Sequence, residues 1–165
     1  MPTHAIFLGG PIGAGKTTLG RALAERLGGA FLDGDNFSDP NRPWYSSVLQ
    51  TNRRIARSGL SAIEQKGLVV IAYPLRCVSW IYFRRVFGDK GVRPLFVSLR
   101  ASYASIIRHE RARSFSNEEH ERIKIMIAEG YGARPFSDLI VDTDQGDFAT
   151  TLARLEGGVR RLMAP

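Results

Sequence analysis

The sequence GPIGAGKT, at residues 10–17, matches the phosphate-binding pattern G-x-x-x-x-G-K-T. A short apolar run at residues 4–9 precedes it and indicates a buried strand. After it, leucines recur every four residues over 16–27, as they do on one face of a helix. A strand, a glycine-rich loop and a helix are the context that the pattern requires. These residues therefore predict a loop that binds a nucleoside triphosphate, the alternative being an ordinary glycine turn.

The residue types of this loop suit phosphate chemistry. Glycines let backbone N–H groups turn inward around anionic oxygens at the positive end of a helix. The Lys16 ammonium can reach the β- and γ-phosphates, and the Thr17 hydroxyl can ligate Mg²⁺. The residues expected to bind ATP in this loop are Gly10, Gly13, Ala14, Gly15, Lys16, Thr17 and Thr18.

Composition places the chain among ordinary globular proteins. With 165 residues, 44% of them hydrophobic and 24% charged, we expect one compact α/β domain over residues 1–165. No apolar run approaches the roughly 18 residues of a membrane span, and no membrane partner is expected. The N-terminus lacks the pattern of a signal peptide, which predicts a cytoplasmic location. The single cysteine, Cys77, excludes an internal disulfide framework and is typical of a packing or surface thiol.

The net charge of +7 has two interpretations. A basic surface can bind nucleic acid, or the arginines can surround a polyanionic nucleotide. The arginines are spread along the chain and form no basic tail. This spread favours the second interpretation, so a nucleic-acid partner is not expected. The sequence makes no prediction of oligomeric state.

Apolar runs alternate with helical stretches, which predicts a parallel sheet built from βαβ units. The predicted strands are Ala5–Leu8, Ala30–Leu32, Leu68–Ala72, Pro94–Leu99 and Leu139–Val141. The predicted helices are Lys16–Leu27, roughly Ser46–Lys66, Cys77–Phe87, Tyr103–Glu110, roughly Asn117–Glu129, and Phe148–Leu162. Core positions on the helices at 77–87 and 148–162 are expected to include Trp80, Ile81, Phe83, Val86, Phe87, Phe148, Leu152, Leu155, Val159 and Leu162. Ligands of such sheets gather at the carboxyl ends of the strands.

Two carboxylates follow the second predicted strand, at Asp33 and Asp35. One can hold Mg²⁺ through water, and the other can accept the proton of an attacking hydroxyl. The strand Leu68–Ala72 ends in Tyr73-Pro74 without a carboxylate, which leaves Asp33 as the best candidate for the metal. The alternative is an acidic turn, because Asp and Gly are both favoured in turns.

Arginines near the same edge of the sheet predict an anionic acceptor. Arg53 and Arg54 lie early on a predicted helix, and Arg76 follows the third strand. A guanidinium group grips an anion with its planar fork. The aromatic pair at 44–45 could line a small pocket. For either helix arginine, a solvated helix face is the alternative.

A third group of arginines, at 108, 111 and 113, precedes small polar residues. This composition suits a lid, at about residues 110–118, that closes over phosphates. An arginine brought in by closure offsets the charge of the phosphoryl-transfer transition state. The alternative is a charged helix end that pairs with nearby glutamates.

These motifs resemble those of small P-loop kinases of the nucleoside-monophosphate-kinase-like group, which includes gluconate, adenylylsulfate and shikimate kinases. Residues 31–36, FLDGDN, are similar to the L-D-G-D-N of adenylylsulfate kinases, and residues 110–115, ERARSF, look like the lid arginines of gluconate kinases. Residues 138–143, DLIVDT, are similar to the last strand of the whole group. The segments on the acceptor side depart from each of these patterns.

The resemblance implies a three-layer P-loop fold whose five-stranded parallel sheet has the order 2-3-1-4-5, with an arginine-bearing lid. It implies an ATP- and Mg²⁺-dependent kinase that phosphorylates a small hydroxyl compound. The implied catalytic residues are Lys16, Asp35 and Arg111, the metal residues Thr17 and Asp33, and the substrate residues Asp35, Arg53 and Arg76. Arg108 or Arg111 would meet the adenine or the phosphates. Two alternatives stay open: a nucleotide-binding ATPase or switch module, and a nucleic-acid 5′-hydroxyl kinase.

Overall fold

The computed structural model of the chain describes residues 2–108 and 114–165. Five strands form one sheet in the order β2-β3-β1-β4-β5, and every pair of neighbours is parallel. The strands are β1 Thr3–Gly9, β2 Ala30–Asp33, β3 Leu68–Ala72, β4 Val92–Arg100 and β5 Leu139–Asp142. The parallel sheet and the strand order 2-3-1-4-5 are therefore confirmed.

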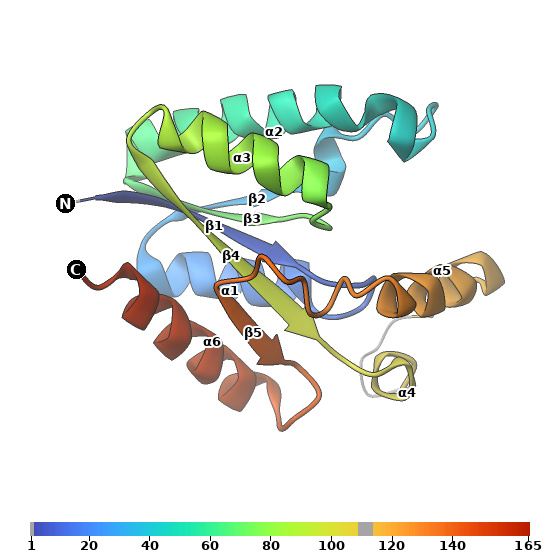
Figure 1. Cartoon of the computed structure of the whole chain (residues 1–165). Coiled ribbons are helices and arrows are strands. Elements are labelled where there is room, and N and C mark those ends of the chain that lie inside the picture. Colours follow the sequence, from blue (N-terminus) through green and yellow to red (C-terminus); the bar gives the residue numbers. More distant parts are fainter. Residues whose placement is uncertain (1, 109–113) are drawn as a thin grey trace.

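Helices cover both faces of this sheet (Figure 1). They are α1 Lys16–Leu27, α2 Trp44–Lys66, α3 Cys77–Gly88, α4 Tyr103–Ile106, α5 Asn117–Ala128 and α6 Phe148–Met163, with a short 3₁₀ helix, η1, at Gly34–Phe37. One face carries α1 and α6, and the other carries α2 and α3. The short α4 and the helix α5 lie beyond the carboxyl ends of the strands, away from both chain termini.

The sheet separates two hydrophobic cores because successive side chains of a strand point to opposite faces. In β1, Ile6 and Leu8 join the core beneath α1 and α6, whereas Ala5 and Phe7 join the core beneath α2 and α3. Phe7 stacks on Phe83 with ring centroids 4.6 Å apart. Burial on both faces explains why the strands read as continuous apolar runs.

Three sequence expectations about helices were wrong. The helix predicted over 103–110 ends at Ile106. The Ile106 side chain is buried against the phosphate loop, close to Gly13. Ile81, expected in the core, is 56% exposed, because it faces away from the sheet while Phe83 and Phe87 fill that core. Phe148 is 48% exposed because the first turn of α6 borders a pocket rather than the sheet.

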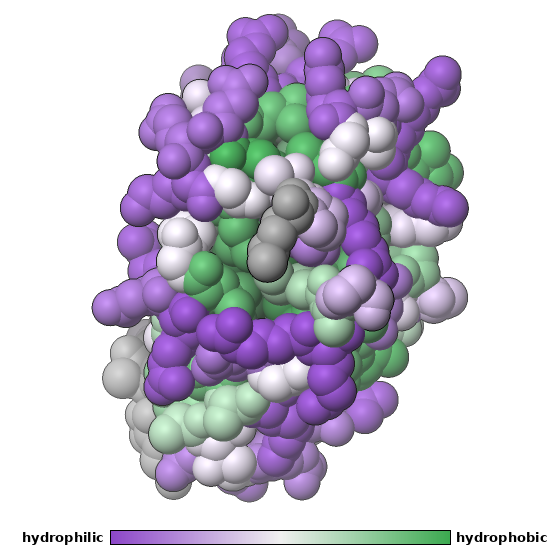
Figure 2. All heavy atoms as spheres, turned by 90° about the vertical axis from the view of Figure 1, so that its left-hand side faces the viewer, coloured by the Kyte–Doolittle hydropathy of each residue, from purple (hydrophilic) through white to green (hydrophobic). Residues whose placement is uncertain are grey.

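The opposite end of the molecule carries no expected site. Figure 2 views this end, where hydrophilic side chains surround a smaller number of apolar ones. A search of residues 2–108 and 114–165 finds no helix long and apolar enough to cross a membrane.

Candidate active site

The loop between β1 and α1 has the conformation that its glycines permit. Gly13 has a φ of +81°, in the left-handed region that residues with a Cβ rarely adopt. A methyl group there would lie 2.6 Å from Cγ2 of Ile106. The loop ends at Gly15, and α1 begins at Lys16. The positive end of α1 therefore opens onto the loop, as a phosphate site requires.

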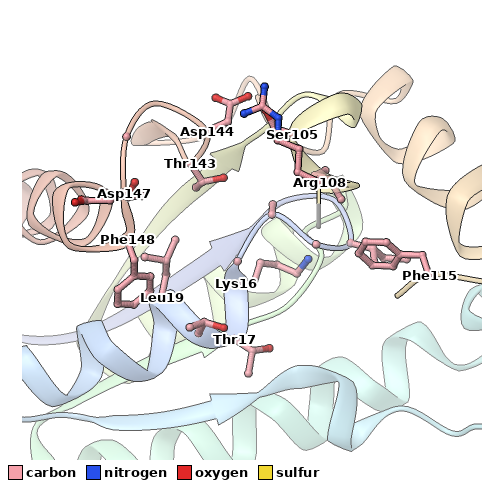
Figure 3. A pocket seen from close by; sticks show the side chains of 18 of the residues that line it. Lys16, Thr17, Leu19, Ser105, Arg108, Phe115, Thr143, Asp144, Asp147 and Phe148 are labelled. Carbon is pink, nitrogen blue, oxygen red and sulfur yellow. The ribbon is translucent and has the colours of Figure 1, made fainter. Parts of the chain in front are cut away.

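A pocket of about 870 Å³ lies over this loop, within the size range of small-molecule sites. Asp35 and Pro74 line it. Figure 3 shows Lys16 and Thr17 on the phosphate loop side and Thr143, Asp144, Asp147 and Phe148 from the chain after β5. Its lining comprises Ile12, Gly13, Ala14, Gly15, Lys16, Thr17, Thr18, Leu19, Asp35, Pro74, Ser105, Ile106, Arg108, Phe115, Thr143, Asp144, Gly146, Asp147, Phe148 and Thr151. All the predicted nucleotide-binding residues except Gly10 thus line one cavity.

The side chain of Lys16 is held beside the phosphate loop by the backbone carbonyls of that loop. Its Nζ donates hydrogen bonds to the carbonyl oxygens of Gly10 at 2.9 Å and Pro11 at 2.8 Å. The ammonium group is partly buried and lines the pocket. Phosphate oxygens that enter the pocket would meet this charge directly.

Thr17 and Asp33 meet across the carboxyl edge of the sheet. The Thr17 hydroxyl donates to Oδ2 of Asp33 at 3.3 Å, and Oδ1 of Asp33 accepts a hydrogen bond from the backbone N–H of Asp35 at 3.1 Å. The second bond caps η1 and fixes the turn that carries both carboxylates. A hydroxyl beside a carboxylate suits Mg²⁺, which keeps several waters and takes one or two carboxylates together with phosphate oxygens.

The donor set fits such an ion only with oxygens from a nucleotide. Among the residues that the structure describes, no group of three or more His, Cys, Asp or Glu side chains could hold a metal by itself. Thr17, which lines the pocket, and Asp33, to which it donates a hydrogen bond, supply two oxygens. Phosphate and water would therefore complete the shell.

Asp35 lines the same pocket from the turn after β2. The turn rests on a ring, because a methyl group at Gly34 would lie 2.5 Å from Cδ2 of Tyr73. Tyr73 is 5% exposed, and its backbone N–H donates to the carbonyl of Leu8 at 3.0 Å. The β3–α3 loop thus sets the position of the Asp35 turn.

Arg76 lies at the end of that loop, directly before α3. Its guanidinium carbon is 3.8 Å from the ring centroid of Trp44 and 5.9 Å from that of Tyr131. Its Nε is buried and has no hydrogen-bond partner among the residues described. A stacked guanidinium keeps its in-plane N–H donors for an anion.

Burial and two charged neighbours shift the pKa of Tyr73 in opposing directions. Burial of the phenol raises this pKa above its ordinary value, and the Asp35 carboxylate adds to the rise. The positive charge of the Arg76 guanidinium lowers it. The charges of Asp35 and Arg76, both assigned to the acceptor from the sequence, thus act on the same phenol in opposite directions.

Sequence reasoning missed Tyr131 and Arg134, which complete this side of the site. Arg134 donates from Nε to the carbonyl of Leu75 at 2.9 Å and from Nη1 to the carbonyl of Glu129 at 3.0 Å. Its guanidinium carbon is 3.9 Å from the Tyr131 ring centroid. The tyrosine and arginine in residues 130–135, GYGARP, were the available signal.

The two arginines predicted on the helix after the Asp35 turn, Arg53 and Arg54, lie on the exposed face of α2. Arg53 is exposed on α2 and is not among the residues that line the pocket. Arg54 donates to the carbonyl of Phe37 at 3.5 Å, at the end of the Asp35 turn. Of the predicted acceptor arginines, Arg76 acts on the pKa of Tyr73, and it too is not among the residues that line the pocket.

The predicted lid is described only in part. Arg111, with the rest of 109–113, lies outside the described residues. Arg108 lines the pocket, and Figure 3 shows its side chain pointing toward the loop that carries Asp144. Phe115 also lines the pocket, and Ser116 caps α5.

The far end of the pocket is built by the loop after β5. Asp144 accepts a hydrogen bond from the N–H of Ser102 at 3.0 Å, which lowers the pKa of its carboxyl. Asp147 caps α6 by accepting from the N–H of Thr150 at 2.8 Å. Both carboxylates thus stabilise the loop, and Phe148 offers an exposed ring at the same end.

The fold and the pocket together define a P-loop protein of the phosphoryl-transfer class. The shikimate kinase family model matches residues 12–42, which include Lys16, Thr17, Asp33 and Asp35. The shikimate kinase of Halorhodospira halophila is 30% identical over 164 residues, covering 91% of this chain and 90% of its own. The chain belongs to the shikimate kinase family.

Solved structures of the same fold include kinases with other acceptors. A gluconokinase from Sinorhizobium meliloti aligns with a TM-score of 0.70 at 19% identity, over 97% of this chain and 93% of that one. An APS kinase from Mycobacterium tuberculosis aligns with a TM-score of 0.62 at 16% identity, over 99% of each chain.

The chain is accordingly an ATP-dependent small-molecule kinase, a phosphotransferase with an alcohol group as acceptor. The small-molecule kinase is therefore favoured over the two alternatives, a nucleotide-binding switch module and a nucleic-acid 5′-hydroxyl kinase.

Proposed function

We propose that this kinase phosphorylates a hydroxyl group of a small carboxylate, with shikimate as the first acceptor to test. The observation that carries this proposal is that one pocket joins Lys16 and Thr17 to Asp35, whose turn rests on Tyr73, a residue of the loop that ends at Arg76. A relative that matches along most of its length is a shikimate kinase. The matched family segment ends at residue 42, before Arg76, so the acceptor side is argued from this chain's own residues.

The donor half would bind ATP with the loop and the first turn of α1. The contacts proposed are Gly10, Gly13, Ala14, Gly15, Lys16, Thr17 and Thr18, with Arg108 at the far side. Thr17 and Asp33 would hold Mg²⁺ with the nucleotide phosphates. When bound, the ion supplies positive charge that stabilises the transferring phosphoryl group. Lys16 would add charge to the same oxygens.

The acceptor half would use Asp35 as the general base. The acceptor oxygen forms a bond to the γ-phosphorus while the bond from that phosphorus to the leaving oxygen of ADP breaks. The proton of the acceptor hydroxyl passes to the Asp35 carboxylate. The geometry supports this role because Asp35 lines the same pocket as Lys16 and Thr17.

Arg76 would bind the carboxylate of the acceptor. Its faces are occupied by Trp44 and approached by Tyr131, which leaves in-plane donors for an anion. Leaving a buried donor such as Nε unpaired costs about 1–3 kcal/mol, and a carboxylate oxygen would satisfy it. Arg53 stays a second candidate contact, from the exposed face of α2.

Closure would complete the site. We propose that residues 1–165 act as one kinase domain with a lid at about 110–118, and that Arg111 approaches the transferring phosphoryl group. A cytoplasmic location follows from the use of ATP as donor.

The test is a panel of hydroxyl acceptors, comprising shikimate, gluconate and adenylylsulfate, supplied with ATP and Mg²⁺ and scored by ADP release. We expect turnover of shikimate and loss of transfer in Asp35→Asn with ATP binding retained. Asp89→Asn, at the end of α3, serves as the matched control. Turnover of another panel member alone would reassign the acceptor, and normal transfer by Asp35→Asn would remove the proposed base.

A further inference from the structure

Arg134 is fixed by hydrogen bonds to three other segments of the chain. Its backbone N–H donates to Oγ of Ser98 on β4 at 3.3 Å. Its side chain donates from Nε to the carbonyl of Leu75 at 2.9 Å and from Nη1 to the carbonyl of Glu129 at 3.0 Å. Glu129 caps the end of α5, where the helix dipole favours a cation. The guanidinium group therefore joins the β3–α3 loop to the end of α5.

Ring contacts lead from this fixed group to Arg76. The guanidinium carbon of Arg134 is 3.9 Å from the ring centroid of Tyr131, and that of Arg76 is 5.9 Å from the same centroid. Arg76 in turn lies 3.8 Å from the ring centroid of Trp44. Tyr131 is 4% exposed, whereas Trp44 is 46% exposed. The buried end of this series of contacts is therefore the end that Arg134 holds.

The donors of the two arginines have different partners. Nε and Nη1 of Arg134 are both occupied by backbone carbonyl oxygens. Nε of Arg76 is buried and has no hydrogen-bond partner among the residues described. A guanidinium group that is already bonded to two carbonyls holds structure, whereas one with a buried donor to satisfy is suited to an anion.

We propose that Arg134 is a positioning residue that places Arg76 for the acceptor. It holds the ring of Tyr131, which Arg76 contacts, and the carbonyl of Leu75, the residue directly before Arg76. Placing a long side chain before the acceptor arrives removes the cost of ordering it during binding. The inference rests on the proposed function of that same site, since it needs Arg76 to bind the acceptor.

The experiment measures kcat and the KM values for ATP and for the acceptor, with shikimate as the first probe. Arg134→Lys keeps the charge but lacks the planar fork that reaches both carbonyls. Its acceptor KM should rise about tenfold, while kcat and the KM for ATP stay within about twofold. Arg160→Lys is the matched control, because Arg160 also donates to a backbone carbonyl, that of Arg26 at 3.2 Å, but joins α6 to α1. It should behave as the wild type.

A double-mutant cycle tests whether Arg134 acts through Arg76. Arg76→Gln should raise the acceptor KM by itself, and adding Arg134→Lys to it should raise the KM no further. Independent increases would mean that Arg134 affects the acceptor by another route, which overturns the inference. If Arg76→Gln leaves the acceptor KM unchanged, the proposed role of Arg76 fails. If Arg76→Gln raises the KM while Arg134→Lys matches the wild type, only the inference about Arg134 is overturned.

Tyr131→Leu is the second variant, and it decides the matter if Arg134→Lys does not fold. It leaves the two carbonyl bonds of Arg134 in place and removes the ring that lies between the two guanidinium groups. Its acceptor KM should also rise, with the KM for ATP unchanged. An acceptor KM equal to that of the wild type would then overturn the inference.

A readout without any acceptor uses Trp44, which becomes the only tryptophan when Trp80 is replaced by Phe. In that background, Arg134→Lys should loosen the stack of Arg76 on Trp44 and increase quenching of Trp44 fluorescence by acrylamide. Because this measurement does not depend on which acceptor the enzyme uses, it separates the inference from the proposed function. An unchanged quenching constant would overturn the inference whatever the acceptor panel shows.

Discussion

The Thr17 hydroxyl lies 3.3 Å from Oδ2 of Asp33, although the two residues belong to different strand–helix units. Thr17 is on the first turn of α1, and Asp33 is the last residue of β2. In the sheet β3 separates β2 from β1, so the contact spans two strand spacings. The pairing places a hydroxyl and a carboxylate together where the phosphates of a nucleotide would end.

Asp33→Asn should weaken the response of the enzyme to Mg²⁺. The amide can still accept the hydrogen bond from the N–H of Asp35, so the turn should persist while the negative charge is lost. We expect the Mg²⁺ concentration for half-maximal activity to rise about tenfold or more, with partial rescue at high Mg²⁺. Activity titrated with Mg²⁺ at saturating ATP measures this. An unchanged midpoint would exclude Asp33 from the metal site.

Gly13→Ala should damage both the loop and its contact with α4. The added methyl group would adopt a strained φ and lie 2.6 Å from Cγ2 of Ile106. We expect a loss of about 2–5 kcal/mol in the free energy of unfolding, measured in urea, together with weaker ATP binding.

Gly28→Ala is the matched control for that substitution. Gly28 also has a positive φ, of +67°, but no atom lies within 4 Å of the added methyl group among the described residues. It should lose only about 1–2 kcal/mol, with ATP binding unchanged. Equal losses in the two variants would show that backbone strain, rather than the contact with Ile106, determines the effect.

The sheet could be predicted from the sequence because its strands are buried on both faces. Val69, Val70 and Ile71 read as one apolar run, although Val69 and Ile71 face one core and Val70 the other. The limits of the helices beyond the sheet were harder to predict. Helical spacing places Phe148 in line with Leu152 and Leu155, and only the pocket above α1 explains its exposure.

The donor half of the site could be predicted because its parts are close in sequence. Lys16, Thr17 and Asp33 lie within two consecutive strand–helix units. The acceptor side joins Trp44, Arg76 and Tyr131, which come from three distant segments. Their contact depends on how α2, α3 and the chain after α5 are placed around the sheet. The spacing of residues within one segment of the sequence does not reveal contacts between segments that are far apart in the chain.

Phe148→Ala should weaken ATP binding with little effect on stability. The ring is 48% exposed and lines the end of the pocket that the loop after β5 builds, where the base of a nucleotide would lie. We expect the KM for ATP to rise about threefold to tenfold, and kcat to stay near the wild-type value. Leu155→Ala, on the same helix but fully buried, should instead lose about 2–5 kcal/mol of stability. If Phe148→Ala instead lost stability without a change in the KM for ATP, Phe148 would act as a core residue and not as a nucleotide contact.

The carboxylate of Asp144 should make the stability of the chain depend on pH. The hydrogen bond from Ser102 N–H holds its folded-state pKa below the ordinary value of 3.8. Because the unfolded state binds the proton more readily, the charged carboxylate stabilises the fold above the ordinary pKa. That contribution is lost as the pH falls through the lower, folded-state pKa.

Asp144→Asn isolates this contribution, since the amide oxygen can accept the same hydrogen bond without charge. The wild type should have the higher Tm at pH 6–7, and the difference should shrink once the pH falls below the ordinary pKa of 3.8. Thermal unfolding of both proteins across this range, at constant ionic strength, measures the difference. A Tm difference that stayed constant down to the lowest pH would mean that packing of the side chain, rather than its charge, holds the loop after β5 in place.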